Sequence, residues 1–81
     1  MADRTTAEEE MTRAELAAYL HEVAEAFDGE GEMTVSVGNK TVRLAPPTGI
    51  DTEVEVGERS AVLGSDEESV RIELTWEPVS S

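Results

Sequence analysis

The alternation of apolar and polar residues constrains this chain more than any other feature, because it is typical of β-strands with one buried face. The last such run, VRIELTW, puts Val70, Ile72, Leu74 and Trp76 on one side, with Arg, Glu and Thr on the other. Runs of the same period cover residues 33–45, interrupted at the dipeptide Gly38-Asn39, and residues 50–57. The sequence therefore predicts four strands that share one apolar face.

The dipeptide Gly38-Asn39 predicts a two-residue hairpin turn and thereby fixes a register. The predicted pairs are Met33 with Leu44, Thr34 with Arg43, Val35 with Val42, Ser36 with Thr41 and Val37 with Lys40. Apolar residues face apolar ones in this register, so the turn and the polarity pattern agree. Prolines 46 and 47 then end the second strand, because proline has no N–H to donate to a ladder.

Residues 12–29 carry the signals of a helix. Thr12 and Glu15 have the spacing of a capping box, and Gly29 suits a left-handed residue after the last turn. The apolar side of this helix is formed by Leu16, Tyr19, Leu20, Val23 and Phe27. A second capping box at Thr6 would begin the helix earlier, but it would place polar residues on that side. We therefore expect residues 1–10 to be a frayed acidic segment.

The predicted fold class is α+β, with one N-terminal helix followed by a four-stranded antiparallel sheet (αββββ) and the helix packed on one sheet face. Every connection between strands is too short for a helical crossover, which favours an antiparallel meander. Residues 11–78 form a single domain in this interpretation, and residues 79–81 are a tail.

One helix is too narrow to cover four strands. The sheet would be ~19 Å wide at ~4.8 Å per strand, whereas a helix with its side chains is ~10 Å across. Uncovered apolar bands of that size are rare in monomers, so we expect a homodimer. The candidate core or interface residues are Leu16, Tyr19, Leu20, Val23, Phe27, Val35, Val42, Val54, Val56, Val70, Ile72, Leu74 and Trp76.

The charge of the chain is strongly negative. There are 19 Asp and Glu residues against six Lys and Arg, giving a formal net charge of −13. Direct binding to nucleic acid or to anionic membranes is not expected, because both need a cationic surface. A disordered acidic tail does not fit, because the acidic residues alternate with apolar ones. An alternative explanation of the charge is that the protein mimics nucleic acid and blocks a DNA-binding protein. Adaptation to molar salt already explains the charge without such a role. At ~1 M salt the Debye length is ~3 Å, so neighbouring carboxylates hardly repel one another.

We therefore expect a halophilic, archaeal, cytoplasmic protein. No apolar run approaches the ~20 residues of a membrane span, and the first residues, MADRTTAEEE, lack the apolar stretch of a signal peptide. The chain has no cysteine, so disulfides and cysteine-ligated metals cannot stabilise it.

Catalytic, cofactor-binding and metal-binding residues are not expected. The segment HEVAE, at residues 21–25, resembles half of a zinc-protease motif, but His21 is the single histidine and two are needed. The acidic clusters 8–10 and 66–68 lack the spacing of a calcium loop. Glu53 and Glu55 lie on one face of their strand, and Arg71 and Glu73 lie on one face of the last strand. All four are expected on the open, polar face of the sheet, which favours cross-strand charge pairing over a catalytic pair of carboxylates.

The order of elements resembles that of the amphi-Trp domain proteins, small prokaryotic proteins common in haloarchaea. The segments that carry the resemblance are TRAELAAYL, VSVGNKTVRLAPP, EVEV and, above all, VRIELTW with Trp76. The resemblance covers residues 12–77 and implies the fold order of a family without an established activity. It implies no catalytic residues.

We therefore expect a non-enzymatic, homodimeric protein-interaction module, whose strand edges are possible docking surfaces for an unknown protein. The alternative is a small-molecule-binding protein with a pocket between helix and sheet, lined by Tyr19, Phe27 and Trp76. Trp76 itself is expected to pack in the core or at the dimer interface, since a tryptophan side chain buries a large area.

Overall fold

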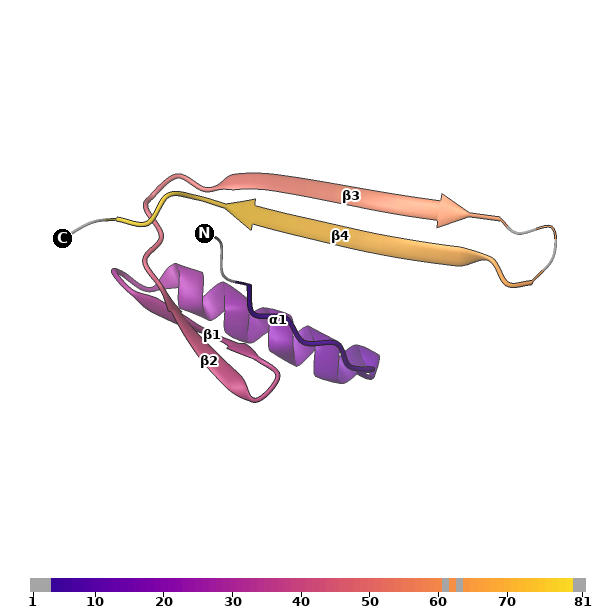
Figure 1. Cartoon of the computed structure of the whole chain (residues 1–81), viewed down its shortest axis with the longest axis horizontal. Coiled ribbons are helices and arrows are strands. Elements are labelled where there is room, and N and C mark those ends of the chain that lie inside the picture. Colours follow the sequence, from indigo (N-terminus) through magenta and orange to yellow (C-terminus); the bar gives the residue numbers. More distant parts are fainter. Residues whose placement is uncertain (1–3, 61, 63, 80–81) are drawn as a thin grey trace.

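The computed structural model describes residues 4–60, 62 and 64–79 of the chain. Its elements, in chain order, are α1 (Arg13–Asp28), β1 (Met33–Val37), β2 (Lys40–Leu44), β3 (Asp51–Arg59) and β4 (Glu67–Thr75) (Figure 1). The predicted order of one helix followed by four strands is confirmed.

Helix α1 begins at the predicted capping box. The Thr12 backbone N–H donates to the Glu15 carboxylate at 2.9 Å, and the Glu15 N–H donates to the Thr12 hydroxyl at 3.1 Å. The alternative start at Thr6 is not used, because residues 4–12 lie outside the helix.

The predicted left-handed end of the helix is wrong. Gly29 has an extended backbone with φ −77°, and the positive φ, +76°, falls at Gly31. The chain therefore reverses two residues later than expected, immediately before it enters β1.

The hairpin of β1 and β2 has the predicted register. Val35 pairs with Val42, Met33 with Leu44, and the other three predicted pairs are present. Gly38 has φ +61° while Asn39 has no positive φ, which is the pattern of a type II′ turn with glycine first.

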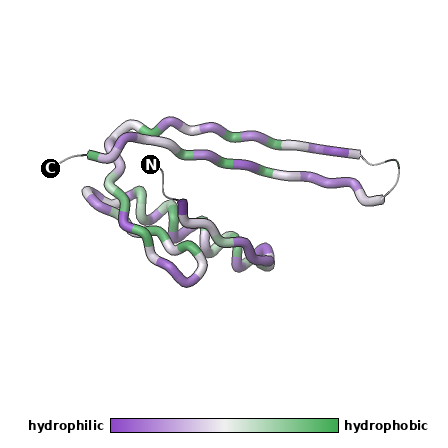
Figure 2. Tube along the Cα trace, viewed as in Figure 1, coloured by the Kyte–Doolittle hydropathy of each residue, from purple (hydrophilic) through white to green (hydrophobic). Residues whose placement is uncertain are grey.

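The hairpin of β3 and β4 is longer than the first. Val54 pairs with Ile72 and Val56 with Val70, and the strands extend to a pair between Arg59 and Glu67. Part of the connection between the two alternating runs thus joins the strands, as the pairs Glu58–Glu68 and Arg59–Glu67 show. Figure 2 shows the alternation of hydrophobic and hydrophilic residues along both strands.

The predicted single four-stranded sheet is wrong, because β1–β2 and β3–β4 form two separate two-stranded sheets. The physical reason lies in the connection between β2 and β3. Pro46 and Pro47, separated from the end of β2 by Ala45 alone, remove two consecutive N–H donors. The Ala45 carbonyl accepts a hydrogen bond from the Val79 N–H at 3.0 Å instead of continuing the ladder toward β3.

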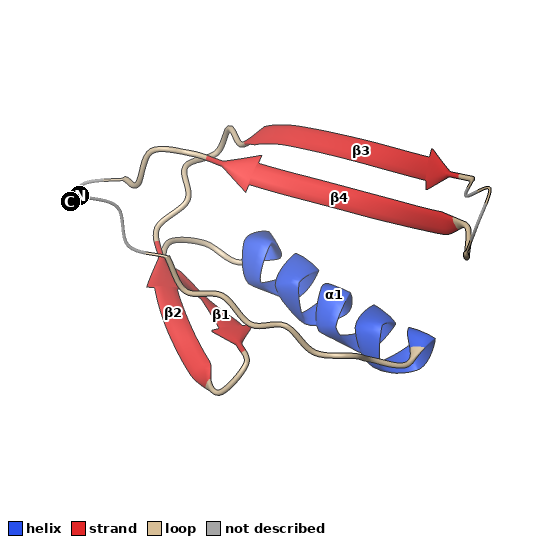
Figure 3. Ribbon diagram, turned by 45° about the vertical axis from the view of Figure 1, so that its right-hand side comes forward, coloured by secondary structure: helices blue, strands red, loops and turns tan. Residues whose placement is uncertain are grey.

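The two hairpins also differ in what lies beside them. Among the described elements, α1 contacts β1, whereas β3 and β4 contact only each other. The second hairpin extends away from the rest of the chain (Figures 1 and 3), and the molecule measures 54 × 26 × 23 Å. The radius of gyration is 15.6 Å, compared with about 12 Å for a compact chain of this length. A single protomer is therefore not a compact domain.

Candidate interaction surface

An extended apolar surface lies on one side of the second hairpin. We call it the hairpin face and define it by Val54, Val56, Val70, Ile72 and Leu74. These side chains are between 37% and 70% exposed, with Leu74 the least and Val70 the most accessible. All five were predicted core or interface residues, and nothing within the described protomer buries them.

The hairpin face is ordered in cross-strand layers. Two apolar layers pair Val54 with Ile72 and Val56 with Val70, and Leu74 lies opposite Thr52 in a third layer. On the same side, toward the end of the hairpin, Glu58 lies opposite Glu68. The apolar patch therefore has a charged boundary at one end, while its other end continues toward Trp76.

The opposite side of the hairpin is polar. Arg59 forms an ion pair with Glu67 across the strands, a pair that was not among the predicted ones. Arg71 lies opposite Glu55 in the register but forms its ion pair along its own strand, with Glu73 at 3.1 Å. The predicted pairing across to Glu55 is therefore replaced by one within β4.

Trp76 lies where the second hairpin meets the helix. Its ring contacts Phe27 edge to face, with centroids 5.6 Å apart and an angle of 87° between the planes. Both residues are half-buried. This contact joins the end of β4 to the C-terminal end of α1, and the predicted place of Trp76 in a core or dimer interface stays a prediction.

A hollow of about 1070 Å³ lies beside this aromatic pair. Phe27 lines it from the helix, Pro46, Pro47 and Ile50 line it from the connection before β3, and Val79 lines it from the C-terminal segment. Its volume is at the upper end of the range for small-molecule pockets.

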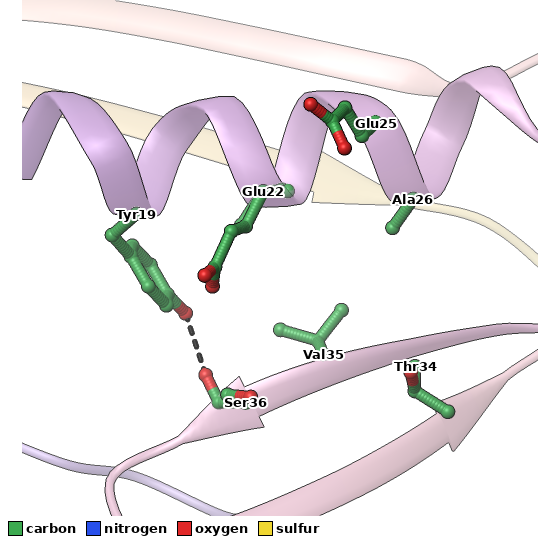
Figure 4. A pocket seen from close by; sticks show the side chains of 8 residues that line it. Tyr19, Glu22, Glu25, Ala26, Thr34, Val35 and Ser36 are labelled. Carbon is green, nitrogen blue, oxygen red and sulfur yellow. Dashed lines mark hydrogen bonds between the residues drawn. The ribbon is translucent and has the colours of Figure 1, made fainter.

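A second, smaller cleft of about 350 Å³ lies between α1 and β1 (Figure 4). The Tyr19 hydroxyl donates a hydrogen bond to the Ser36 carbonyl at 2.8 Å, and Val35 points from β1 toward the helix. Glu22 and Glu25 also line the cleft from α1. The predicted aromatic pocket is therefore divided, because Tyr19 lines this cleft whereas Phe27 lines the hollow near Trp76.

The helix has an uncovered apolar strip of its own, which we call the helix face and define by Leu16 and Leu20. These side chains are 47% and 46% exposed, respectively. The remaining predicted residues of the first half, Val23, Val35 and Val42, are half-buried. Among the described residues, Met33 is the one buried hydrophobic side chain, at 5% exposure.

The solvent-accessible surface area of the chain shows that the protomer buries less surface than a compact protein of this size. The chain exposes 7658 Å², whereas a folded monomer of 8.8 kDa is expected to expose about 4,800 Å². The excess is about 2,900 Å² per chain, or about 5,800 Å² for two chains, which lies above the ~2,000–5,000 Å² of total area that obligate interfaces typically bury.

His21 is exposed on α1, and no three His, Asp or Glu side chains in residues 4–60, 62 and 64–79 are grouped to hold a metal ion. Hydrogen bonding to Thr12 lowers the pKa of the Glu15 carboxyl, and the Thr12 backbone N–H makes the largest contribution, followed by the Thr12 side chain. This shift is a consequence of the helix cap. In the part of the chain that the structure describes, no helix has the length and hydrophobicity to cross a membrane.

Comparison with known proteins identifies the family. Neither the curated proteins nor the solved structures include a significant match to the chain. The model of the Amphi-Trp domain family, by contrast, matches residues 2–81, which is essentially the whole chain. Together with the helix, the amphipathic strands and the tryptophan at the end of β4, this match establishes that the chain belongs to the Amphi-Trp domain family.

Proposed function

We propose that this Amphi-Trp protein is a non-enzymatic interaction module that works as a homodimer. The observation that carries the proposal is the hairpin face, whose five side chains are left open by the protomer. Exposed apolar surfaces of this kind mark protein interaction sites. The excess accessible area argues that the partner is a second copy of the chain. Burying that area would bring the exposed surface of each chain close to the value expected for a folded protein.

The proposal includes a high-salt, cytoplasmic environment. A net charge of −13 on 81 residues means that two copies repel each other in dilute buffer. Molar salt screens this repulsion and strengthens apolar burial, so association and folding are both favoured. The free edges of the two hairpins are then the surfaces available to dock a further protein by strand addition.

The test replaces one residue on the hairpin face and one on its polar side. Ile72→Asp places a charge in the middle of the hairpin face, whereas Ser69→Asp adds the same charge to the opposite side of β4, across from Gly57. Sedimentation in molar potassium chloride is expected to show monomers for Ile72→Asp and dimers for Ser69→Asp. Equal dimerisation of both variants would exclude the hairpin face as the interface.

Small-molecule binding is the second candidate, and the hollow beside Phe27 supports it. Trp76 contacts Phe27 and therefore reports on this hollow. A metabolite that binds there is expected to change Trp76 fluorescence with a saturable dose response. A Pro47→Glu variant, which narrows the hollow, is expected to abolish that response while leaving dimerisation intact.

A further inference from the structure

We propose that the dimer forms by reciprocal docking, in which the hairpin face of each copy lies across the helix face of the other copy. This inference rests on the proposed homodimer and adds which surfaces meet. Each α1 would then lie between the β1–β2 hairpin of its own chain and the β3–β4 hairpin of the second copy. One two-fold axis would relate the two equivalent contacts.

The first argument is that the protomer leaves two apolar surfaces uncovered. The hairpin face belongs to β3 and β4, and the helix face to α1. If two hairpin faces packed against each other, Leu16 and Leu20 would stay 47% and 46% exposed. Reciprocal docking covers both surfaces in a single isologous interface, so it accounts for more of the excess area.

The second argument is a match of dimensions. A two-stranded hairpin is ~10 Å wide at ~4.8 Å per strand, which equals the ~10 Å diameter of one helix. Along its length, the helix face from Leu16 to Leu20 rises ~6 Å, whereas the strand from Val70 to Leu74 extends ~14 Å. One helix therefore matches the hairpin face in width, and the helix face covers part of its length.

The third argument is that the hairpin face does not reach the helix of its own chain. The contact of Phe27 with Trp76 holds the near end of the hairpin at the C-terminal end of α1, and the hydrogen bond from Val79 to Ala45 fixes the neighbouring segment. From there the hairpin diverges, so that neither β3 nor β4 contacts α1. Figure 3 shows the second hairpin running apart from α1, and the exposure of both surfaces leaves them accessible to a second copy.

The test uses introduced cysteines, because the natural chain contains none. Leu20→Cys and Ile72→Cys are made in separate chains, one of which carries a tag that distinguishes mixed from identical pairs on a gel. The chains are mixed, refolded together in molar potassium chloride and treated with a short bis-maleimide. The mixture is expected to give a mixed covalent dimer at a yield at least tenfold above that of either variant alone.

A matched control and a second pair support the interpretation. Glu73→Cys replaces Ile72→Cys in the control, because residue 73 lies on the opposite side of β4, and it is expected to give no mixed dimer with Leu20→Cys. Leu16→Cys with Val54→Cys repeats the experiment with different residues, which guards against a folding defect in either first variant.

Four results would overturn reciprocal docking. Strong cross-linking of Ile72→Cys with itself would show that two hairpin faces meet. A cross-linked monomer from a chain carrying both substitutions would show that the hairpin closes on its own helix. No cross-link from either pair in a protein that light scattering shows to be dimeric would reject reciprocal docking while leaving the proposed homodimer in place. A monomeric natural chain would reject both.

Discussion

Phe27 and Trp76 meet edge to face at 5.6 Å, and their contact connects the helical half of the chain to the long hairpin. Phe27 ends the apolar side of α1, and Trp76 directly follows β4. No strand of the second hairpin contacts α1, β1 or β2 in the described structure, so this aromatic pair is a principal tie between the two halves.

The aromatic contact predicts a measurable coupling. Phe27→Leu and Trp76→Leu, alone and together, form a double-mutant cycle in which the coupling energy is expected to be about 0.5–1.5 kcal/mol. Free energies of unfolding from denaturant titrations in molar salt give the value. Trp76→Phe keeps an aromatic edge and should retain most of the stability, whereas additive effects of the two leucine substitutions would show that the contact stabilises nothing.

The turn of the first hairpin predicts a contrast between two glycines. Gly38→Ala is expected to destabilise the protein by about 1–2 kcal/mol, because alanine resists a positive φ. The added methyl would also lie 3.1 Å from the Ala7 side chain. Gly49→Ala is the control, since nothing lies within 4 Å and its φ is not positive. Equal melting temperatures for the two variants would contradict the assigned turn.

The helix cap predicts a pH dependence. Hydrogen bonding from Thr12 lowers the pKa of the Glu15 carboxyl below its usual value of 4.5 in the folded state. The ionised group therefore favours folding above the unfolded pKa, and this contribution is lost as the pH falls through the lowered, folded pKa.

Glu15→Gln tests this dependence because glutamine can also close a capping box but does not titrate. The natural protein is expected to exceed Glu15→Gln in stability at neutral pH and to lose that advantage as the pH falls below 4.5 through the lowered pKa of Glu15. Unfolding titrations of both proteins across this range give the difference. An advantage that is independent of pH would exclude the assigned role of the carboxylate.

Like charges across the second hairpin predict a salt dependence. Glu53 lies opposite Glu73, whereas the neighbouring Glu55 lies opposite Arg71. Glu53→Lys should stabilise the protein by about 0.2–1 kcal/mol in dilute buffer, and Glu55→Lys should destabilise it. Both effects should shrink in molar salt, where screening acts over ~3 Å.

The melting temperature of the natural protein should itself rise steeply with salt, and a flat salt series would contradict the halophilic interpretation.

The local elements were predictable because their signals are local. The capping box of Thr12 and Glu15 fixes the start of α1, and the Gly38-Asn39 turn with its flanking alternation fixes the first register. The end of α1 was not predictable, because Gly29 and Gly31 both permit a left-handed backbone. Which of the two adopts it depends on how the chain reaches Met33.

The arrangement of the hairpins was less predictable than the hairpins themselves. Alternation shows which residues share a face but not which strands are neighbours, so β2 and β3 were wrongly joined in one sheet. The prolines that end β2 carried the missing signal, because the N–H groups absent there are the ones a continuing ladder needs. The candidate surface was anticipated as a set of residues, yet the separation of Tyr19 from Phe27 and Trp76 depends on which elements pack together.

The most direct test of the account is the mass of the natural protein in solution. Light scattering coupled to size exclusion, at micromolar concentration in molar potassium chloride, should give twice the chain mass of 8.8 kDa. This follows from a protomer that leaves both the hairpin face and the helix face uncovered. A stable, folded species of 8.8 kDa under these conditions would contradict it.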